Sequence, residues 1–362
     1  MINMRIKKIL STLEENGYDA YIVGGYVRDY VLGNETFDVD ISTSAKPKEI
    51  KEIFDLTSGS VDTYGSISFK DSLYNYDITT FRRDIKYVGR KPVAYDFIES
   101  KEEDVLRRDF TINGLYMDST GKIIDLVGGI EDINKKIIRV IGNMNEKMVE
   151  DPLRMLRAIR FASKLDFELE ESLYRYIKQN KQLISSLSYE RRKSELDLIF
   201  SSNNYEVGLT LLKELGILDV LEINYDKVKS CSNKAGIWAQ IEYNKNYPFP
   251  KSERKIIECV NRILKYGTID NITLYECGLY PCIIAGEVLG ISKSNISDMY
   301  KNLPIYSCKD LKFSGIDVMN VLKLKPSKKV KDIIKDIEIN VLSNEIKNEY
   351  EEIKQYVIKN WR

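Results

Sequence analysis

The sequence predicts an α+β protein, with one small mixed β-sheet near the N-terminus followed by a long series of helices. Five short runs in the first 140 residues are rich in β-branched and aromatic residues and are bounded by Gly, Asp or Asn, as strands usually are. These runs are residues 19–25, 38–43, 65–70, 76–81 and 110–118. After about residue 145 the apolar residues recur at spacings of three and four, which is the period of a helix.

Helices are expected between these strands. Residues 4–16 and 46–54 have helical periodicity, and Pro47 fits the first turn of the second helix, where proline is tolerated. A shorter helix is expected directly after the glycine pair Gly24-Gly25, in the segment YVRDYVLG. The later part of the chain is expected to be divided into separate helices by breaks at Gly216, 248–250, Gly267, Gly290 and Pro304.

Length and composition limit the classes of protein to consider. A chain of 362 residues suggests two or three domains. No run of 18 apolar residues predicts a membrane helix, and the N-terminus has no signal-peptide pattern. The five scattered cysteines are typical of reduced thiols in the cytoplasm, and the absence of histidine excludes Ser-His and Cys-His catalysis and a Cys/His zinc site. The 55 basic and 55 acidic residues count mildly against a nucleic-acid-binding protein but allow local basic patches.

The pair Asp38 and Asp40 is the first candidate for chemistry. Residues i and i+2 of a strand point to the same face, so the two carboxylates repel unless a cation lies between them. Oxygen ligands suit Mg²⁺, which also binds substrate phosphates, and sites of this kind support phosphoryl displacement. The alternative for an isolated Asp-x-Asp is a strand edge that faces solvent.

The glycine pair supplies the context that favours the first interpretation. Gly24 and Gly25 allow the backbone to approach a ligand closely, and the helix that follows offers free N–H groups to an anion. Arg28 adds a positive charge. A triphosphate site beside a metal-binding strand is therefore predicted.

Five motifs in this order resemble one family, the class II tRNA nucleotidyltransferases (CCA-adding enzymes) with their bacterial poly(A) polymerase relatives. The motifs are GGYVRD with DVD at residues 24–40, RRDFTINGLYMD at 107–118, DLVGGIED at 125–132, EDPLRMLRAIRFA at 150–162 and SYERRKSEL at 188–196. The resemblance implies a nucleotidyltransferase head of the polymerase-β-like type at residues 1–140, a neck at 141–200, a body at 201–270 and a tail at 271–362. Phe37, Tyr64 and Gly114 depart from the family pattern.

The resemblance also implies roles for individual residues. Asp38, Asp40 and Asp77 would be catalytic, with Mg²⁺ held by the first two. Asp77 has the alternative of an ordinary strand-edge aspartate, and the segment 107–109 that of a surface salt-bridge cluster. The implied nucleotide-binding residues are Gly24, Gly25, Arg28, Arg107, Arg108, Asp109, Asn113, Glu150, Asp151, Arg154, Arg157 and Arg160. Arginine suits phosphate, and Asp109 would accept a hydrogen bond from the ribose 2′-hydroxyl.

Asp151 and Arg154, three residues apart, are expected on one face of a helix. The alternative is a surface ion pair. Against a nucleobase, aspartate accepts from an amino group while arginine donates to a ring nitrogen, a pattern that cytosine and adenine share. Uracil and guanine present the inverse pattern and leave both side chains unpaired, so one pair can select C and A without a template. Glu150 and Arg157 would orient the pair, and Glu190 and Arg191 would support it.

Two basic segments complete the prediction. Residues 81–92, FRRDIKYVGRKP, are expected to form a flexible loop, which in the resembling family accompanies the switch from C to A addition; the alternative is a plain exposed loop. The run KLKPSKKVK at 323–331 is usually a solvated surface. A more specific interpretation of this run is that Lys325, Lys328 and Lys329 contact RNA phosphates.

The sequence therefore predicts a cytoplasmic enzyme that adds C, C and A to the 3′ end of tRNA from CTP and ATP with Mg²⁺. Three alternatives remain open. One is a poly(A) polymerase, and another is a partial enzyme that adds only CC or only A. The third is a non-catalytic RNA-binding protein, which the intact Asp38 and Asp40 disfavour.

Overall fold

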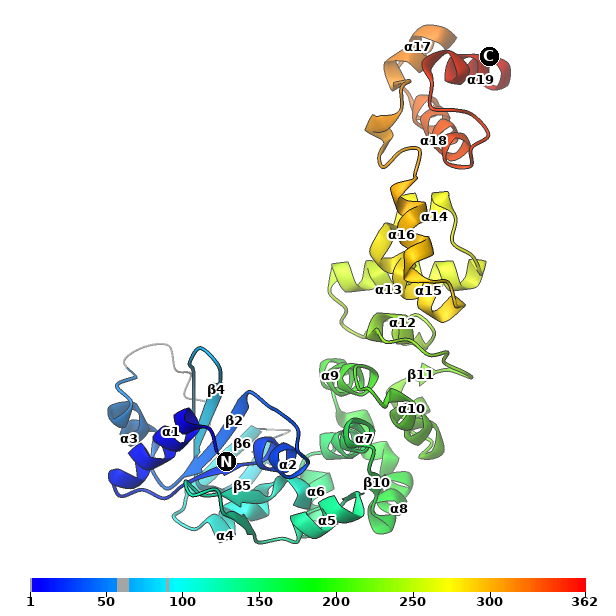
Figure 1. Cartoon of the computed structure of the whole chain (residues 1–362). Coiled ribbons are helices and arrows are strands. Elements are labelled where there is room, and N and C mark those ends of the chain that lie inside the picture. Colours follow the sequence, from blue (N-terminus) through cyan, green and yellow to red (C-terminus); the bar gives the residue numbers. More distant parts are fainter. Residues whose placement is uncertain (1, 57–64, 89–90) are drawn as a thin grey trace. The chain divides into compact units, whose positions relative to one another are not determined.

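The computed structural model describes residues 2–56, 65–88 and 91–362, with 84–88 and 91–94 described by their backbone alone. The chain forms two compact units that divide between Glu222 and Ile223. Each unit is described by itself. The catalytic motifs all lie in the first unit, whose N-terminal part holds the sheet (Figure 1).

The sheet of the first unit has six strands in the order β3-β4-β2-β1-β7-β8. β2 and β4 run parallel, whereas the other neighbours are antiparallel, so the predicted mixed sheet is confirmed. The strands are β1 (Ala20–Val23), β2 (Asp38–Thr43), β3 (Ser66–Lys70), β4 (Asn75–Thr80), β7 (Leu115–Met117) and β8 (Ile123–Asp125).

Alternation along β2 separates the core from the site. Val39 and Ile41 are buried, whereas Asp38 and Asp40 between them are exposed. On the core side, α1 (Met4–Glu15) contacts β1, and α3 (Pro47–Ile53) contacts β3. The carboxylates therefore lie on the opposite face of the sheet, and helix α2 (Gly25–Val31) follows β1 as the sequence predicts.

Two predictions for the head are wrong in detail. Residues 110–118 do not form one strand, because the 3₁₀ turn Thr111–Asn113 precedes β7. The segment 81–92 is not an irregular loop, because β5 (Arg82–Val88) and β6 (Lys91–Phe97) pair as an antiparallel hairpin. Gly89, Arg90 and Tyr64 lie outside the described residues.

The predicted helix through residues 150–162 is interrupted. Helix α6 (Met144–Glu150) ends at Asp151, whose backbone is extended, and α7 (Leu153–Leu165) begins after Pro152. Proline disfavours a helical conformation in the residue before it, which explains the break. The other elements of the first unit are α4 (Lys101–Asp104), η1 (Val105–Arg107), α5 (Gly129–Lys135), β9 (Ile137–Ile138), β10 (Glu168–Leu169), α8 (Glu171–Asn180), η3 (Lys181–Ser186), α9 (Tyr189–Phe200), α10 (Tyr205–Glu214) and α11 (Leu218–Leu221).

The second unit is almost entirely helical, as predicted. Its helices are α12 (Lys234–Trp238), α13 (Lys251–Tyr266), α14 (Asn271–Cys277), α15 (Leu279–Leu289), α16 (Lys293–Lys301), η4 (Cys308–Asp310), α17 (Gly315–Leu322), α18 (Lys328–Leu342) and α19 (Tyr350–Trp361). Only the two-residue strands β11 (Ile223–Asn224) and β12 (Glu242–Tyr243) depart from that prediction among its described residues. Within the described residues, no helix is long and apolar enough to span a bilayer.

Candidate active site

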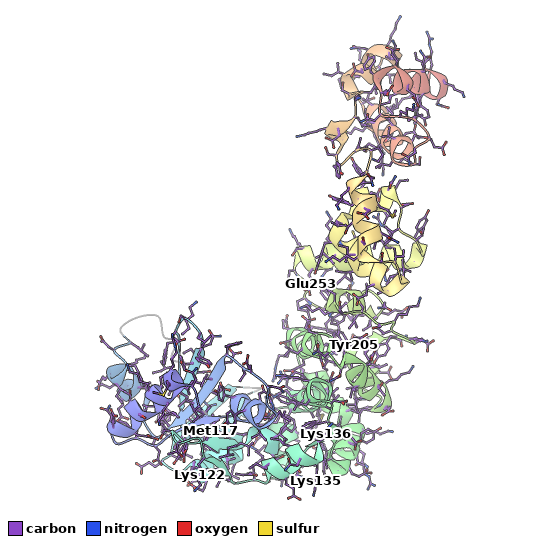
Figure 2. All side chains as sticks on the ribbon, viewed as in Figure 1. Met117, Lys122, Lys135, Lys136, Tyr205 and Glu253 are labelled. Atoms are coloured by element: carbon purple, nitrogen blue, oxygen red, sulfur yellow. The ribbon has the colours of Figure 1, made fainter. Side chains whose placement is uncertain are left out.

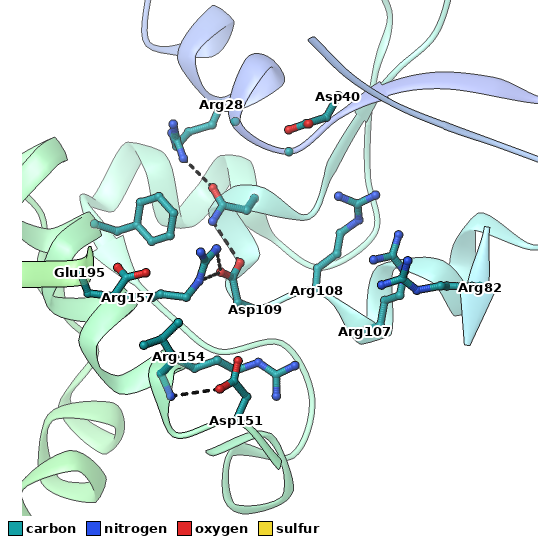
Figure 3. Close-up of a pocket in the computed structure, with 15 residues that line it drawn as sticks. Arg28, Asp40, Arg82, Arg107, Arg108, Asp109, Asp151, Arg154, Arg157 and Glu195 are labelled. Atoms are coloured by element: carbon teal, nitrogen blue, oxygen red, sulfur yellow. Dashed lines mark hydrogen bonds and ion pairs between the residues drawn. The ribbon is translucent and has the colours of Figure 1, made fainter. Parts of the chain in front are cut away.

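A cavity of about 500 Å³ opens in the first unit where the end of β1, the motif at residues 107–113 and helix α7 meet (Figure 3). Its lining contains most of the predicted nucleotide-binding residues and several that were not predicted. The described residues that line it are Gly24, Gly25, Arg28, Asp40, Arg82, Arg107, Arg108, Asp109, Asn113, Asp151, Leu153, Arg154, Arg157, Phe161 and Glu195. Six arginines therefore face four carboxylates, which makes the cavity suited to a polyanion.

The three predicted catalytic carboxylates lie side by side on the sheet. Asp40 on β2 is the register partner of Asp77 on β4, and Asn75 donates to Asp38 at 2.8 Å. The pKa of Asp40 is raised, first by burial and then by the charges of Asp77 and Asp38. The side chain of Asp40 nevertheless remains accessible to solvent. Ser66 and Ser68 donate to Asp77.

These carboxylates fit a magnesium site. A cation between Asp38 and Asp40 would relieve the repulsion that raises the pKa of Asp40. No group of three or more Asp, Glu, Cys or His side chains in the described residues could hold a metal ion on its own. A site completed by substrate phosphates is the usual arrangement for Mg²⁺, which needs only one or two carboxylates from the protein.

Gly24 is placed where only glycine fits easily. Its φ of 66° lies in the left-handed region, and a Cβ there would lie 3.3 Å from Oδ2 of Asp40. The turn from β1 into α2 can therefore pass close beside the carboxylate. A side chain at this position would crowd the junction between the cavity and Asp40.

Asp104 was not predicted, yet it fixes the arginines of the second motif. It is 0% exposed, and it accepts from Nε of Arg107 at 2.8 Å, from Nη2 of Arg108 at 3.0 Å and from the Tyr116 hydroxyl at 2.8 Å. The arginines and Tyr116 outweigh its burial and lower the pKa of Asp104 to about 2. Arg108 also donates to Ser42. Both guanidinium groups are thus held in place before any ligand arrives.

Asp109 lies at the centre of a second network. Arg157 donates to its Oδ2 through two nitrogens, while the Phe110 N–H and the Asn113 amide donate to Oδ1. Although burial opposes it, the charge of Arg157 lowers the pKa of Asp109 to about 2. Arg28 donates to the oxygen of Asn113 at 2.7 Å and extends the network. A ribose contact at Asp109 therefore requires one of these donors to give way.

Asp151 and Arg154 both line the cavity although they do not share a helix. Oδ1 of Asp151 accepts from Arg191 and from the Leu153 N–H, whereas Oδ2 has no hydrogen bond within the described part of the chain. Nη1 of Arg154 donates to the Lys147 carbonyl and to Glu150, and its Nε and Nη2 have no such partner there. Each side chain is therefore fixed by one of its polar atoms, and its remaining polar atoms are available to a ligand.

Other predicted residues take different places. Arg157 pairs with Asp109 rather than with the Asp151–Arg154 pair, and Arg160 pairs with Glu195 beside the cavity lining. Exposed Glu190 has no contact with Asp151 among the described residues, unlike Arg191. In the second unit, the predicted RNA-binding lysines are all exposed: Lys328 and Lys329 begin α18, and Lys325 precedes that helix.

Sequence analysis missed Asp104, Arg82, Phe161 and Glu195. The Phe161 ring lies beneath three guanidinium groups, with that of Arg160 at 4.5 Å and those of Arg28 and Arg157 at 5.3 and 5.4 Å from its centroid. Two spacings in the sequence could have indicated these residues, because residues three or four apart share a helix face: that of Phe161 from Arg157 on α7, and that of Asp104 from Arg107 and Arg108.

Three family models match the chain. Residues 20–139 match the "Poly A polymerase head domain", 166–225 the "Probable RNA and SrmB- binding site of polymerase A", and 243–357 "tRNA nucleotidyltransferase domain 2". Fold and cavity together therefore define a nucleotidyltransferase.

Curated relatives show which family of nucleotidyltransferases the chain resembles. The CCA-adding enzyme of Ligilactobacillus salivarius is 34% identical to this chain, and the match covers 95% of this chain and 93% of that enzyme. The CCA-adding enzyme of Bacillus licheniformis is 33% identical, and the match covers 96% of each chain. The chain belongs to the CCA-adding enzyme family, as its motifs predict. The CCA-adding enzyme of Bacillus stearothermophilus, solved in complex with CTP, superposes with a TM-score of 0.84 at 28% identity, covering 98% of this chain and 96% of its own. The Thermotoga maritima enzyme, solved with tRNA, has the same fold at 20% identity and a TM-score of 0.71, covering 100% and 97%.

Proposed function

We propose that the protein adds C, C and A to the 3′ end of tRNA that lacks part or all of CCA, using CTP and ATP and releasing pyrophosphate. The observation that carries the proposal is a pair of groups in the residues that line the cavity: Oδ2 of Asp151 and the Nε and Nη2 atoms of Arg154, which have no hydrogen-bond partner in the described part of the chain. An acceptor beside a donor matches cytosine and adenine, and it rejects uracil and guanine. The Bacillus stearothermophilus relative was solved with CTP, and another CCA-adding enzyme with ATP.

The other residues have complementary roles. Arg107 and Arg108, held by Asp104, bind the triphosphate, and Gly24 lets the backbone pass beside Asp40. Mg²⁺ held by Asp38 and Asp40 would lower the pKa of the attacking 3′-hydroxyl and offset the charge on the triphosphate. Asp77, as the register partner of Asp40, sets the charge on that face of the sheet.

The remaining parts bring the RNA to the site. Lys325, Lys328 and Lys329 bind phosphates of the tRNA through their exposed charges. The match of residues 243–357 to a tRNA nucleotidyltransferase domain supports tRNA as the substrate. We also propose a cytoplasmic location, because the five cysteines are all free thiols.

A test with single nucleotides separates this proposal from its rivals. The protein is incubated with tRNA truncated before CCA and with CTP alone, ATP alone or both. The proposal predicts two residues from CTP alone and three from the mixture. Long tails from ATP alone would indicate a poly(A) polymerase. A product that stops at CC with both nucleotides present would indicate a partial enzyme.

A further inference from the structure

A second hollow borders the carboxylates on the side away from the arginine cavity. It has a volume of about 590 Å³, and Asp40 is the residue that lines both spaces. The other described residues that line it are Asp38, Val39, Ser68, Phe69, Lys70, Asn75, Tyr76 and Asp77. We refer to it as the β3–β4 hollow.

The strand order places the two spaces on opposite sides of β2. The sheet runs β3-β4-β2-β1, so the β3–β4 hollow extends from Asp40 across β4 to the edge strand β3. The arginine cavity instead includes Gly24 and Gly25, which follow β1. A molecule in one space can thus meet a molecule in the other at Asp40.

The chemistry of phosphoryl transfer needs such an arrangement. The attacking and leaving oxygens lie roughly in line, on opposite sides of the phosphorus. The leaving pyrophosphate belongs on the side of Arg107 and Arg108, because guanidinium groups bind phosphate there. The attacking hydroxyl must therefore come from the other side of the carboxylates, where the β3–β4 hollow lies.

Lys70 gives the β3–β4 hollow a place for a phosphate. Register aligns Asp38, Asn75 and Lys70 across β2, β4 and β3, and residues opposite one another point to the same face of a sheet. Lys70 is exposed, and no ion pair to it is found in the described part of the chain. It is the one cation among the described residues that line the hollow, beside three aspartates that repel phosphate.

We propose that the β3–β4 hollow holds the 3′-terminal nucleotide of the RNA acceptor, and that Lys70 binds the phosphate linking it to the preceding nucleotide. The proposal rests on the proposed function and adds the path of the second substrate. The ammonium of Lys70 draws the RNA backbone to the edge of β3, so that the terminal ribose lies over Asp77 and its 3′-hydroxyl reaches Asp40. The nucleotide triphosphate fills the arginine cavity on the far side.

The test compares Lys70→Ala with Lys122→Ala, which removes an exposed lysine beside the opposite edge strand β8 (Figure 2). The substrate is a short RNA acceptor-stem hairpin that ends before CCA, so that few contacts outside the site contribute. Lys70→Ala should raise the KM for the hairpin by about fivefold or more. Its slope of log KM against log salt should fall by about 0.7, the share of one phosphate on a single strand.

Three further results complete the test. The KM for CTP should stay near that of the wild type, Lys70→Arg should restore most of the RNA affinity, and Lys122→Ala should change neither constant. Equal behaviour of the two alanine variants would overturn the proposal, as would a rise in the KM for CTP alone. Anisotropy of a labelled hairpin without nucleotide gives the same comparison independently of turnover. If Lys70→Ala alone weakens binding of the hairpin but the wild-type protein adds no C, the proposed function is refuted while the RNA-binding role of Lys70 is supported.

Discussion

Arg191 on helix α9 donates a hydrogen bond to Oδ1 of Asp151 at 2.5 Å, across 40 positions of the sequence. The Leu153 N–H donates to the same oxygen at 3.2 Å. Asp151 lies outside a helix, so these two donors, rather than a helical backbone, fix the direction of its carboxylate. Oδ2 has no hydrogen bond among the described residues, so Arg191 would orient the carboxylate to which the proposed function assigns the reading of the base.

Arg191→Ala should loosen the choice of nucleotide without touching the nucleotide itself. The Asp151 carboxylate would lose a charged hydrogen bond, so kcat/KM for CTP and ATP should fall by about tenfold while that for UTP changes less. Glu190→Ala is the matched control, because Glu190 is the exposed neighbour of Arg191 on α9. A ratio of CTP to UTP turnover that is equal in both variants would contradict the positioning role of Arg191.

Asp104→Asn should weaken binding of the triphosphate. The amide keeps the shape of the carboxylate but loses the charge that holds Arg107 and Arg108, so the KM for CTP should rise by about tenfold. Asp132→Asn serves as control, because Asp132 is also buried and pairs with Arg139 outside the cavity lining. The KM for tRNA should not change in either variant. A similar rise in both variants would assign Asp104 a structural role only.

The head should lose stability in acid. The folded pKa values of Asp104 and Asp109 are both about 2, below the unfolded value of about 3.9, so the stabilisation is present above pH 4 and is lost as pH falls toward 2. At pH 3 the expected loss is roughly 1 kcal/mol for each carboxylate.

Hydrogen exchange of the head amides measures this loss, since both tryptophans, Trp238 and Trp361, lie in the second unit and report nothing on the head. Opening free energies at pH 6 and pH 3 are compared in the wild type and in the double variant Asp104→Asn, Asp109→Asn. The double variant should show a smaller difference between the two pH values. An equal difference would mean that other groups cause the acid loss.

The hairpin β5–β6 allows a test of the role predicted for residues 81–92 in the switch from C to A addition. Replacing residues 85–94 by Asn-Gly keeps the pairs Arg82–Phe97, Arg83–Asp96 and Asp84–Tyr95 and closes them with a favoured two-residue turn. C addition should remain largely intact, while addition of the final A should fall at least tenfold. Equal loss of both activities would point to a general role in folding. The measurement is the rate of each step on tRNA ending in C or CC.

Local patterns predicted the elements that depend on local physics. The strand β2 follows from alternation of Asp38 and Asp40 with Val39 and Ile41, and α1 from apolar residues at Ile6, Leu10 and Leu13. The hairpin β5–β6 was not predicted, because basic residues with a glycine and a proline are as typical of an exposed loop as of a strand. The break at Asp151 follows from Pro152 and was available in the sequence.

Site residues that belong to sequence motifs were predicted, whereas residues that only the fold brings to the cavity were missed. Glu195 reaches the cavity lining beside Arg160, from which it is separated by 35 positions, and no periodicity encodes that contact. Asp104 pairs with Arg107 and Arg108 at spacings of three and four, so that its contacts were available in the sequence. Arg157 pairs with Asp109 across 48 positions, whereas the sequence predicted that Arg157 orients the pair Asp151 and Arg154. Long-range ion pairs depend on the tertiary packing of α7 against the head.

Selection of C and A by Asp151 and Arg154 can be tested by direct competition between the four nucleotides. tRNA truncated before CCA is incubated with all four nucleotides at equal concentration, and the added residues are sequenced for the wild type, Asp151→Ala and Arg154→Ala. The wild type should add C, C and A and then stop. Both variants should misincorporate U or G, with selectivity reduced by about 5- to 150-fold. Unchanged C and A selection in both variants, at any overall rate, would contradict the account.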